Sequence, residues 1–274
     1  MHIASACVEE QVGGVIWLVD EGGLSQTLAQ DVWAGRRRPR GNLVAQSLAA
    51  HGNQWQAPVL RSRRISRIAV LAAQRGQGIG QALVREQQQW AQQEQRDFLS
   101  VSFGFQPALW RFWQRCGFQL VRIGSHIDAS SGCYSAMALL PLSEAGSALT
   151  ASAHNELLRD WFWLRRDIPL ALDLPLMADQ TFTVEDWRNL VGFAGAHRPP
   201  EACQGALSRL MMRSPMALTA LRLWLEQGRN VTECVHLLQL TGRKALVQRW
   251  RVETAQALRQ LDEAEWQRWH DTVL

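Results

Sequence analysis

The stretch VLAAQRGQGIGQALV, residues 70–84, places Gly76, Gly78 and Gly80 at alternate positions between two apolar runs. A glycine-rich turn from a strand into a helix lets backbone N–H groups approach a phosphate, and the positive end of the helix dipole strengthens the contact. The spacing does not fit the G-x-G-x-x-G of dinucleotide-binding turns. It also lacks the G-K-S/T ending of ATP-binding loops, because Lys244 is the only lysine of the chain. The stretch therefore predicts either a loop for another phosphate ligand or a turn without a ligand.

The composition is that of a globular protein. The chain has 274 residues, of which 47% are hydrophobic and 20% charged, so one large domain or two ordinary ones can form. We find no secretory leader and no apolar run near the roughly 20 residues that span a bilayer, and therefore expect a cytoplasmic protein without membrane contact. The cysteines are scattered and form no CxxC pair, so we expect reduced thiols and no metal site. These are Cys7, Cys116, Cys133, Cys203 and Cys234.

Arginine clusters mark two parts of the N-terminal half, in a chain whose net charge is +4. The stretch GRRRPRGN holds Arg36, Arg37, Arg38 and Arg40, and RSRRISR holds Arg61, Arg63, Arg64 and Arg67. Neither run contains an acidic residue. Such clusters either contact the phosphates of a polyanion or form an ordinary solvated surface.

A third basic segment lies near the C-terminus. GRKALVQRWRVE combines the aromatic Trp250 with four cations, Arg243, Lys244, Arg249 and Arg251. Cations interleaved with an aromatic ring suit contact with RNA backbone and bases. The alternative is an amphipathic helix with a solvated basic face.

The hydrophobic pattern changes near residue 150. Before it, short apolar runs predict strands at 13–23, 64–71, 97–104, 119–127 and 133–142, and helical periodicity predicts helices at 79–95 and 107–118. Beyond it, every periodic segment is helical. The sequence therefore predicts an α+β unit over 1–146, followed by an all-α domain over 147–274.

Several motifs identify a family. Arg75-x-x-Gly78-x-Gly80, after a strand and at the start of a helix, resembles the coenzyme A loop of GCN5-related N-acetyltransferases, the GNAT superfamily. A longer series, in this order, is similar to the bacterial tRNA(Met) cytidine acetyltransferase family: DEGGLSQ, RRPRGNLVAQSLAAHG, SRIAV, LSVSFGF, LWRFWQRCGF, SSGCYSAMALLPLS and LTGRKAL. The resemblance covers nearly the whole chain. It implies a GNAT-type mixed sheet with flanking helices, lacking the first helices of that fold, and a helical tRNA-binding domain.

The resemblance also implies a reaction and its partners. The acetyl group of acetyl-CoA would pass to N4 of the wobble cytidine of elongator tRNA(Met), forming N4-acetylcytidine. The family's N-terminal ATP-driven module has no counterpart here, so a separately encoded ATPase or helicase-like module is an expected partner. The arginine and lysine residues of 36–40 and 243–251 would contact RNA. The implied coenzyme site comprises Ile68, Ala69, Val70, Arg75, Gly76, Gln77, Gly78, Ile79, Gly80, Gln81 and Arg115.

Two side chains are candidates for moving protons. Tyr134, the only tyrosine, could protonate the departing thiolate, or it could be a core residue with a satisfied hydroxyl. His126 lies in a polar turn and could accept the amine proton, or it could be a surface or tRNA-contacting histidine. A main-chain N–H near Val70 or Leu71 is the expected donor to the oxyanion.

The chain departs from the family pattern at two positions. Relatives usually read IAVHP where this chain reads IAVLA, so Leu71 replaces a histidine, and Ala108 replaces a glutamate. Two alternatives therefore stay open. One is an acetyltransferase that acts on a protein or small-molecule amine, and the other is a non-catalytic fragment that binds tRNA or coenzyme A.

Overall fold

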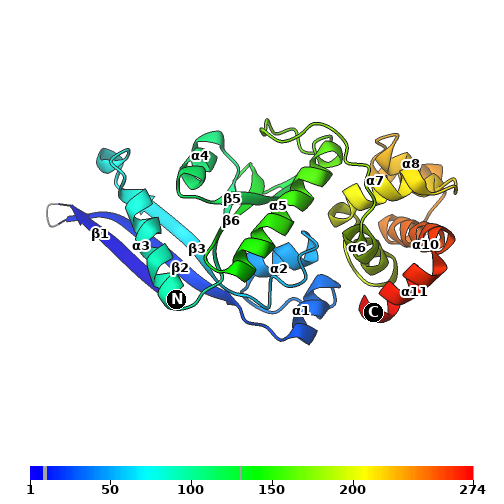
Figure 1. Cartoon of the computed structure of the whole chain (residues 1–274). Helices are drawn as coiled ribbons and strands as arrows, with labels where there is room; N and C mark the ends of the chain where they lie inside the picture. The colour runs from blue at the N-terminus through cyan, green and yellow to red at the C-terminus, as the bar shows by residue number, and fades with distance from the viewer. Residues whose placement is uncertain (9–10, 130, 274) are drawn as a thin grey trace. The chain divides into compact units, whose positions relative to one another are not determined.

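The computed structural model describes residues 1–8, 11–129 and 131–273 (Figure 1). The chain forms two compact units, unit 1 from residues 1–29 and 39–157 and unit 2 from residues 30–38 and 158–274. The helix α5 (Glu144–Leu164) is continuous across the predicted boundary at 146/147, so the units divide further along it. None of the described helices is both long and apolar enough to cross a bilayer.

Unit 1 is built on a mixed sheet of six strands in the order β1-β2-β3-β4-β6-β5. Only β3 and β4 pair in parallel, and the other neighbours are antiparallel. The strands are β1 (His2–Val8), β2 (Gln11–Gly22), β3 (Arg61–Val70), β4 (Phe98–Gly104), β5 (Gln119–Ile127) and β6 (Tyr134–Pro141). The predicted mixed sheet with flanking helices is confirmed.

Helices cover both faces of this sheet, and Figure 1 shows α3 along β1, β2 and β3. On one face, α3 and α4 pack their apolar side chains against residues such as Ile16, Leu99 and Ala138. On the other, α2 and the first part of α5 pack against neighbours that include Phe98 and Met137. The helical segments are α1 (Gln26–Trp33), α2 (Leu43–Ala50), the short 3₁₀ turn η1 (Ala72–Gln74), α3 (Ile79–Gln93) and α4 (Pro107–Arg115).

Two arginines of the RSRRISR cluster lie inside unit 1 as ion pairs. Arg63 is fully buried, and its guanidinium contacts Asp20 at 2.7 Å and Glu94 at 2.6 Å. Arg64 contacts the buried Glu21 at 2.6 Å. The register places Arg63 opposite Asp20 of β2, and Glu94 directly follows α3, so the acids come from other elements rather than from the run itself. Of the two readings of this cluster, contact with a polyanion therefore does not hold for Arg63.

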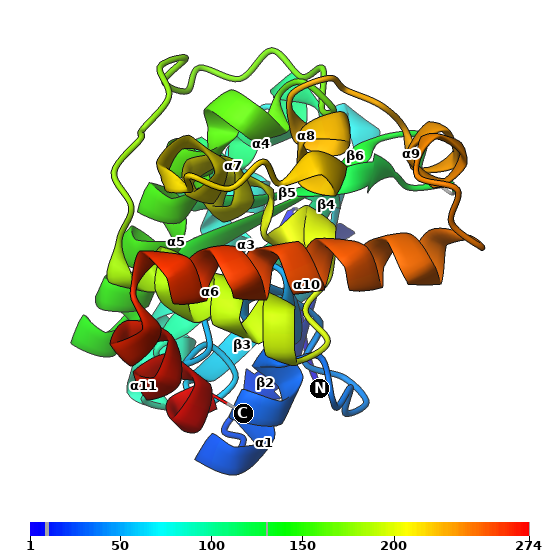
Figure 2. The same cartoon turned by 90° about the vertical axis from the view of Figure 1, so that its right-hand side faces the viewer.

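Unit 2 is helical and is arranged around α10, which Figure 2 shows lengthwise in front of α6 with α11 at its end. Trp250 of α10 is 2% exposed and stacks on Trp224 at 4.6 Å. Arg209 is fully buried and contacts Asp186 at 2.6 Å and Asp160 at 2.8 Å. The segments are α6 (Val184–Gly195), the 3₁₀ turn η2 (Pro200–Ala202), α7 (Gln204–Arg213), α8 (Thr219–Leu225), α9 (Val231–Leu237), α10 (Arg243–Leu261) and α11 (Glu263–Val273).

Candidate functional site

Strands β3 and β4 separate as they approach the glycine loop. Their pairing extends only from Ser62–Phe98 to Ile65–Val101, although β3 continues to Val70 and β4 to Gly104. Beyond this point, the facing backbone groups of the two strands no longer bind each other. An opening of this kind presents main-chain donors and acceptors to an extended ligand. Ile68, Ala69 and Val70, three of the predicted coenzyme residues, lie on its β3 side.

The register identifies which backbone groups face the opening. The Leu71 N–H donates to the Gly13 carbonyl at 2.9 Å, and Val70 lies opposite Gly14. Because backbone groups alternate in direction along a strand, those of Leu71 and Ala69 face β2, whereas those of Ile68 and Val70 face the opening. The Leu71 N–H is already bound and cannot donate to the oxyanion, so the prediction is wrong for this residue. The Val70 N–H remains the candidate donor.

The glycine loop has the backbone geometry of an anion site. Gly76 and Gly78 adopt φ values of 82° and 85°, which favour glycine, and an added Cβ at either would meet nothing within 4 Å. Gly80 instead lies against α4, because a Cβ there would be 3.1 Å from Phe112. The N-cap of α3 is Gly78, with no side-chain cap and no acidic residue in the first turn. The first N–H groups of α3 are thus left for another acceptor, and a phosphate group fits them.

Two cations were predicted beside this loop. Arg75 is exposed, and its Nε donates to the Val70 carbonyl at 3.2 Å, which holds the side chain at the end of β3. Arg115 is exposed in the last turn of α4. Gln77 is exposed, and its amide donates to the Ala73 carbonyl at 3.4 Å. Neither arginine has an acidic partner among the residues that the structure describes.

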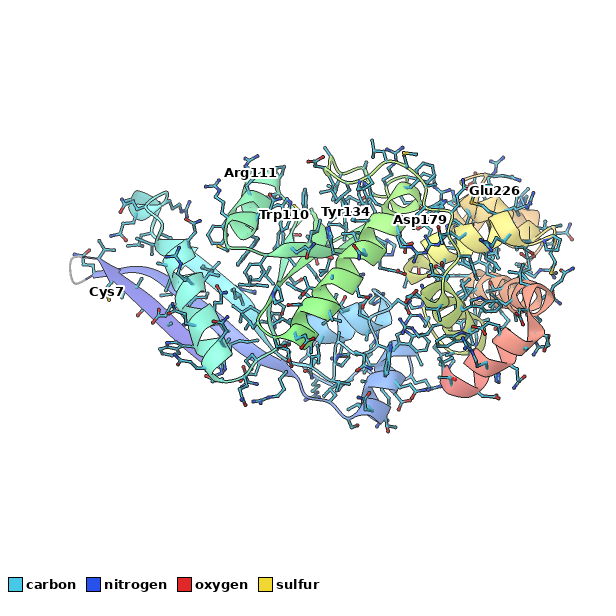
Figure 3. The ribbon with its side chains drawn as sticks, in the orientation of Figure 1. Cys7, Trp110, Arg111, Tyr134, Asp179 and Glu226 are labelled. Carbon is cyan, nitrogen blue, oxygen red and sulfur yellow. The ribbon has the colours of Figure 1, made fainter. Side chains whose placement is uncertain are left out.

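Tyr134 and His126 are not brought together directly. Tyr134 begins β6, is half-buried, and accepts a backbone hydrogen bond from Phe105 at 2.7 Å, just past the end of β4 (Figure 3). Its partner in the register is Ile127, whereas His126 is the preceding residue and is exposed. Tyr134 therefore lies one strand away from the β4 side of the opening, and His126 is not opposite it.

Two aromatic residues near Tyr134 were not predicted as site residues from the sequence. Phe103 pairs with Ala136, two residues along β6 from Tyr134, and stacks on Trp110 at 6.4 Å. These rings place an apolar wall near the end of β4. The available signal was the aromatic content of LSVSFGF and LWRFWQRCGF, but strand register was needed to show which rings meet.

The basic loop between α1 and α2 is exposed. Arg36 contacts Asp31 at 2.9 Å, whereas Arg37, Arg38 and Arg40 have no acidic partner in the described part of the chain. Unpaired guanidinium groups on the surface are suited to phosphate contacts. Arg36, Arg37 and Arg38 belong to unit 2, and Arg40 belongs to unit 1.

The basic residues of α10 have different environments. Arg243 contacts Glu201 at 2.7 Å and Arg249 contacts Glu253 at 3.2 Å, while Lys244 is exposed and has no acidic partner within the described ranges. Arg251 stacks over Phe193 at 5.3 Å, and burial lowers its pKa. With Trp250 buried as well, the aromatic part of this segment belongs to the core of unit 2.

Comparison with known proteins matches both halves of the chain. An acetyltransferase (GNAT) domain matches residues 30–120, and a tRNA-binding domain matches residues 146–264. The tRNA(Met) cytidine acetyltransferase of Pectobacterium atrosepticum is 57% identical over 285 residues, which covers 100% of this chain and 40% of the relative. The chain belongs to the tRNA(Met) cytidine acetyltransferase family. The Yersinia pestis tRNA(Met) cytidine acetyltransferase is also 57% identical, over 96% of this chain and 38% of that protein.

The chain thus spans about 40% of the length of these tRNA(Met) cytidine acetyltransferases. Among solved structures, a Bacillus subtilis acetyltransferase in complex with CoA matches with a TM-score of 0.34 and 16% identity, over 52% of this chain and 76% of that one. The GNAT match includes β3, the glycine loop and α3, and the tRNA-binding match includes the whole of α10. Within the described residues, no group of three or more His, Cys, Asp or Glu is placed to hold a metal ion.

Proposed function

We propose that this chain transfers the acetyl group of acetyl-CoA to N4 of the wobble cytidine of elongator tRNA(Met), forming N4-acetylcytidine in the cytoplasm. The observation that carries the proposal is the opening between β3 and β4, which leads to an uncapped, glycine-rich helix start. The names of the relatives supply the acceptor. In this assignment, residues 1–146 hold acetyl-CoA and residues 147–274 bind tRNA.

The β3 strand and the loop would hold the coenzyme. Ile68 and Val70 present their main chain to the pantetheine arm, with Ala69 between them, and the N–H groups from Gly76 to Gln81 bind the pyrophosphate. Arg75 and Arg115 add positive charge near this diphosphate, and neither is neutralised by an acidic neighbour in the described part of the chain.

Acetyl-CoA supplies an activated thioester, and the chain positions the acceptor and manages charge. The cytosine amino group is uncharged at neutral pH, so its nitrogen attacks the thioester carbon without prior loss of a proton. As the C–N bond forms, the Val70 N–H donates to the oxygen that gains negative charge. As the C–S bond breaks, the Tyr134 hydroxyl gives its proton to the departing thiolate. Water or His126 accepts the amine proton, and the Tyr134 phenolate regains a proton from solvent.

Exposed cations would hold the RNA. Arg37, Arg38, Arg40 and Lys244 are free of acidic partners among described residues. Arg36 and Arg243 form surface ion pairs that phosphate can displace, whereas Arg249 is itself exposed but pairs with the buried Glu253. Arg251 belongs to α10 itself, and its contact with Phe193 would hold that helix in position. We include a separately encoded ATP-driven module as a second partner.

Mass spectrometry of tRNA nucleosides tests this function. The chain is incubated with acetyl-CoA and an elongator tRNA(Met) transcript, with and without ATP, and the matched control transcript carries uridine at the wobble position. We expect N4-acetylcytidine only in the first transcript. Intact tRNA binding without any acetylcytidine would establish a non-catalytic binding module, and acetylation of peptides or polyamines instead of tRNA would establish an amine acetyltransferase.

A further inference from the structure

Unit 2 contains a cavity of about 550 Å³ that the proposed reaction does not use. It lies where the C-terminal end of α5 meets the start of α7 and the end of α8, and all its lining residues belong to unit 2. Its volume is within the roughly 300–1,000 Å³ of ligand-binding cavities. The lining combines two aromatic rings, arginine, a fixed amide and a hydroxyl.

Two adjacent aromatic residues supply apolar surface in two perpendicular planes. Phe162 is 36% exposed, and Trp163 is partly exposed. Their rings meet edge to face, with centroids 5.6 Å apart and an angle of 89° between planes. The guanidinium of the buried Arg209 lies 5.1 Å from the Trp163 ring centre, which holds that ring in place. A planar ligand can therefore stack on one of these rings and place its edge against the other.

One arginine of the lining is available to an anion and the other is not. Arg166 contacts Asp167 at 3.1 Å and donates to the Leu225 carbonyl at 2.5 Å, so its charge and donors are engaged. Arg165 is exposed and lies over the Phe162 ring at 5.6 Å, with no acidic partner among described residues. Its guanidinium is thus placed beside an aromatic face and is free to bind an anionic group.

Polar groups inside the cavity are held in defined orientations. The Gln204 side chain is 5% exposed, and its amide NH₂ donates to Asp167 at 3.0 Å and to the Trp163 carbonyl at 3.5 Å. Ser208 donates to the Gln204 carbonyl at 2.9 Å, which leaves its oxygen as an acceptor. Fixed acceptors of this kind suit the amino and imino groups on the edge of a nucleobase.

We propose that this cavity binds one unpaired nucleotide of an RNA strand, with the base against Phe162 and Trp163 and a phosphate on Arg165. A simple carboxylate ligand would use Arg165 but leave both rings in water, whereas a nucleotide covers both kinds of group. The tRNA-binding domain match covers the cavity residues. That the bound polymer is RNA rests on the proposed function. Glu226, at 50% exposure and 3.8 Å from Arg222, is the acidic residue of the lining and weakens phosphate binding there, whereas the nearby Asp167 is bound to Arg166 and Gln204.

Fluorescence anisotropy of a labelled mixed-sequence pentaribonucleotide bound to the full chain tests the proposal without any acetyl transfer. We expect Phe162→Leu to weaken binding about tenfold through loss of stacking. Arg165→Gln is expected to weaken binding and to reduce the dependence of log Kd on log salt by about 0.7, the value for one phosphate contact on a single strand. Glu226→Gln should strengthen binding. Arg213→Gln removes the same charge from an exposed arginine of α7 outside the cavity and should change nothing.

Thermal melts of each variant, followed by circular dichroism, exclude unfolding as the cause of weaker binding. Wild-type affinity in both Phe162→Leu and Arg165→Gln, or no pentanucleotide binding by the wild type, would overturn the proposal. Competition by a free nucleoside monophosphate at the same concentration as the pentanucleotide would overturn it in favour of a small-nucleotide site. Each of these results is independent of whether N4-acetylcytidine is formed, so the two proposals can fail separately.

Discussion

Gly78 is the residue at which backbone conformation and proposed ligand binding coincide, because it has φ of 85° and is the N-cap of α3. We expect Gly78→Ala to lower the free energy of unfolding by about 1–2 kcal/mol, since a Cβ is disfavoured in the left-handed region. Acetyl-CoA binding, measured by titration calorimetry, should weaken at least about tenfold as the N–H groups move. Unchanged affinity would contradict the assignment of the loop.

Gly228 offers a matched control for this substitution. It also has a positive φ, 66°, with nothing within 4 Å of an added Cβ, but it lies in unit 2. Gly228→Ala should therefore cost a similar free energy of unfolding and leave acetyl-CoA affinity unchanged.

Tyr134 and His126 can be separated by conservative substitutions. We expect Tyr134→Phe to lower kcat about 100-fold with little change in KM for acetyl-CoA, because only the donor to the thiolate is removed. His126→Gln should have a small effect, since His126 is exposed and is not opposite Tyr134. Steady-state kinetics of tRNA acetylation measures both. The opposite ranking would transfer the proton-donating role away from Tyr134.

Arginine residues that look alike in the sequence have unlike roles in the structure. Arg37 is exposed and free of acidic partners within the described residues, Arg63 is buried between carboxylates, and Arg251 stacks on a core ring. Local sequence could not separate them, because the partners of Arg63 and Arg251 lie on other strands and helices. A basic run by itself therefore does not locate an RNA surface.

At the scale of elements, α2 shows why the local sequence pattern does not predict some helices. Its first N–H groups are bound by the Glu21 carboxylate of β2, which accepts from Leu43 and Val44 at 2.9 Å each. The capping group is thus 22 residues away along the chain rather than at the N-cap. The helices α3 and α4 could be predicted because their periodicity, glycine and proline signals are local.

The contact between β2 and β3 makes unit 1 sensitive to acid. Burial raises the pKa of Asp20, but hydrogen bonds from Arg63 and His2 and the charges of Arg63 and Arg96 outweigh it and lower the value to about 2. Since the folded pKa is depressed, the stabilisation is present above the ordinary value of 3.8 and is lost as pH falls toward 2.

Asp20→Asn should therefore reduce the pH dependence of the free energy of unfolding between pH 4 and pH 2. Across this window, we expect the free energy of unfolding of the wild type to fall by about 1 kcal/mol more than that of Asp20→Asn. This value is reduced because the carboxylate is 34% exposed. Urea denaturation at a series of pH values measures it, and the two proteins should have the same slope between pH 7 and pH 8. Equal slopes at low pH would show that Asp20 does not carry this stabilisation.

For the whole molecule, the division into two units predicts separable stability. Ligand present at 100 times its Kd stabilises the unit that binds it by about 2.7 kcal/mol. CoA should therefore raise the melting temperature of the transition of unit 1 alone. Arg209→Met removes the buried guanidinium that contacts both Asp160 and Asp186, leaving Asp186 paired with Arg159, and should lower the other transition, with a cost of about 3–5 kcal/mol.

Differential scanning calorimetry can measure both effects in one protein. A single transition that is shifted by CoA and by Arg209→Met alike would show that the two units unfold together. Such coupling would act through α5 and α1, because the residues of each of these helices belong to both units.

The sequence by itself determined the fold class and the family and predicted a phosphate-binding loop, because these depend on local periodicity, glycine positions and the order of motifs. Tertiary structure alone decided that Val70 rather than Leu71 faces the opening, that Arg63 and Trp250 are internal, and that Phe162, Arg165 and Gln204 share a cavity. The reason is physical. Strand register and helix packing bring together residues that are far apart along the chain, and these contacts determine which charged and aromatic groups remain available to a ligand.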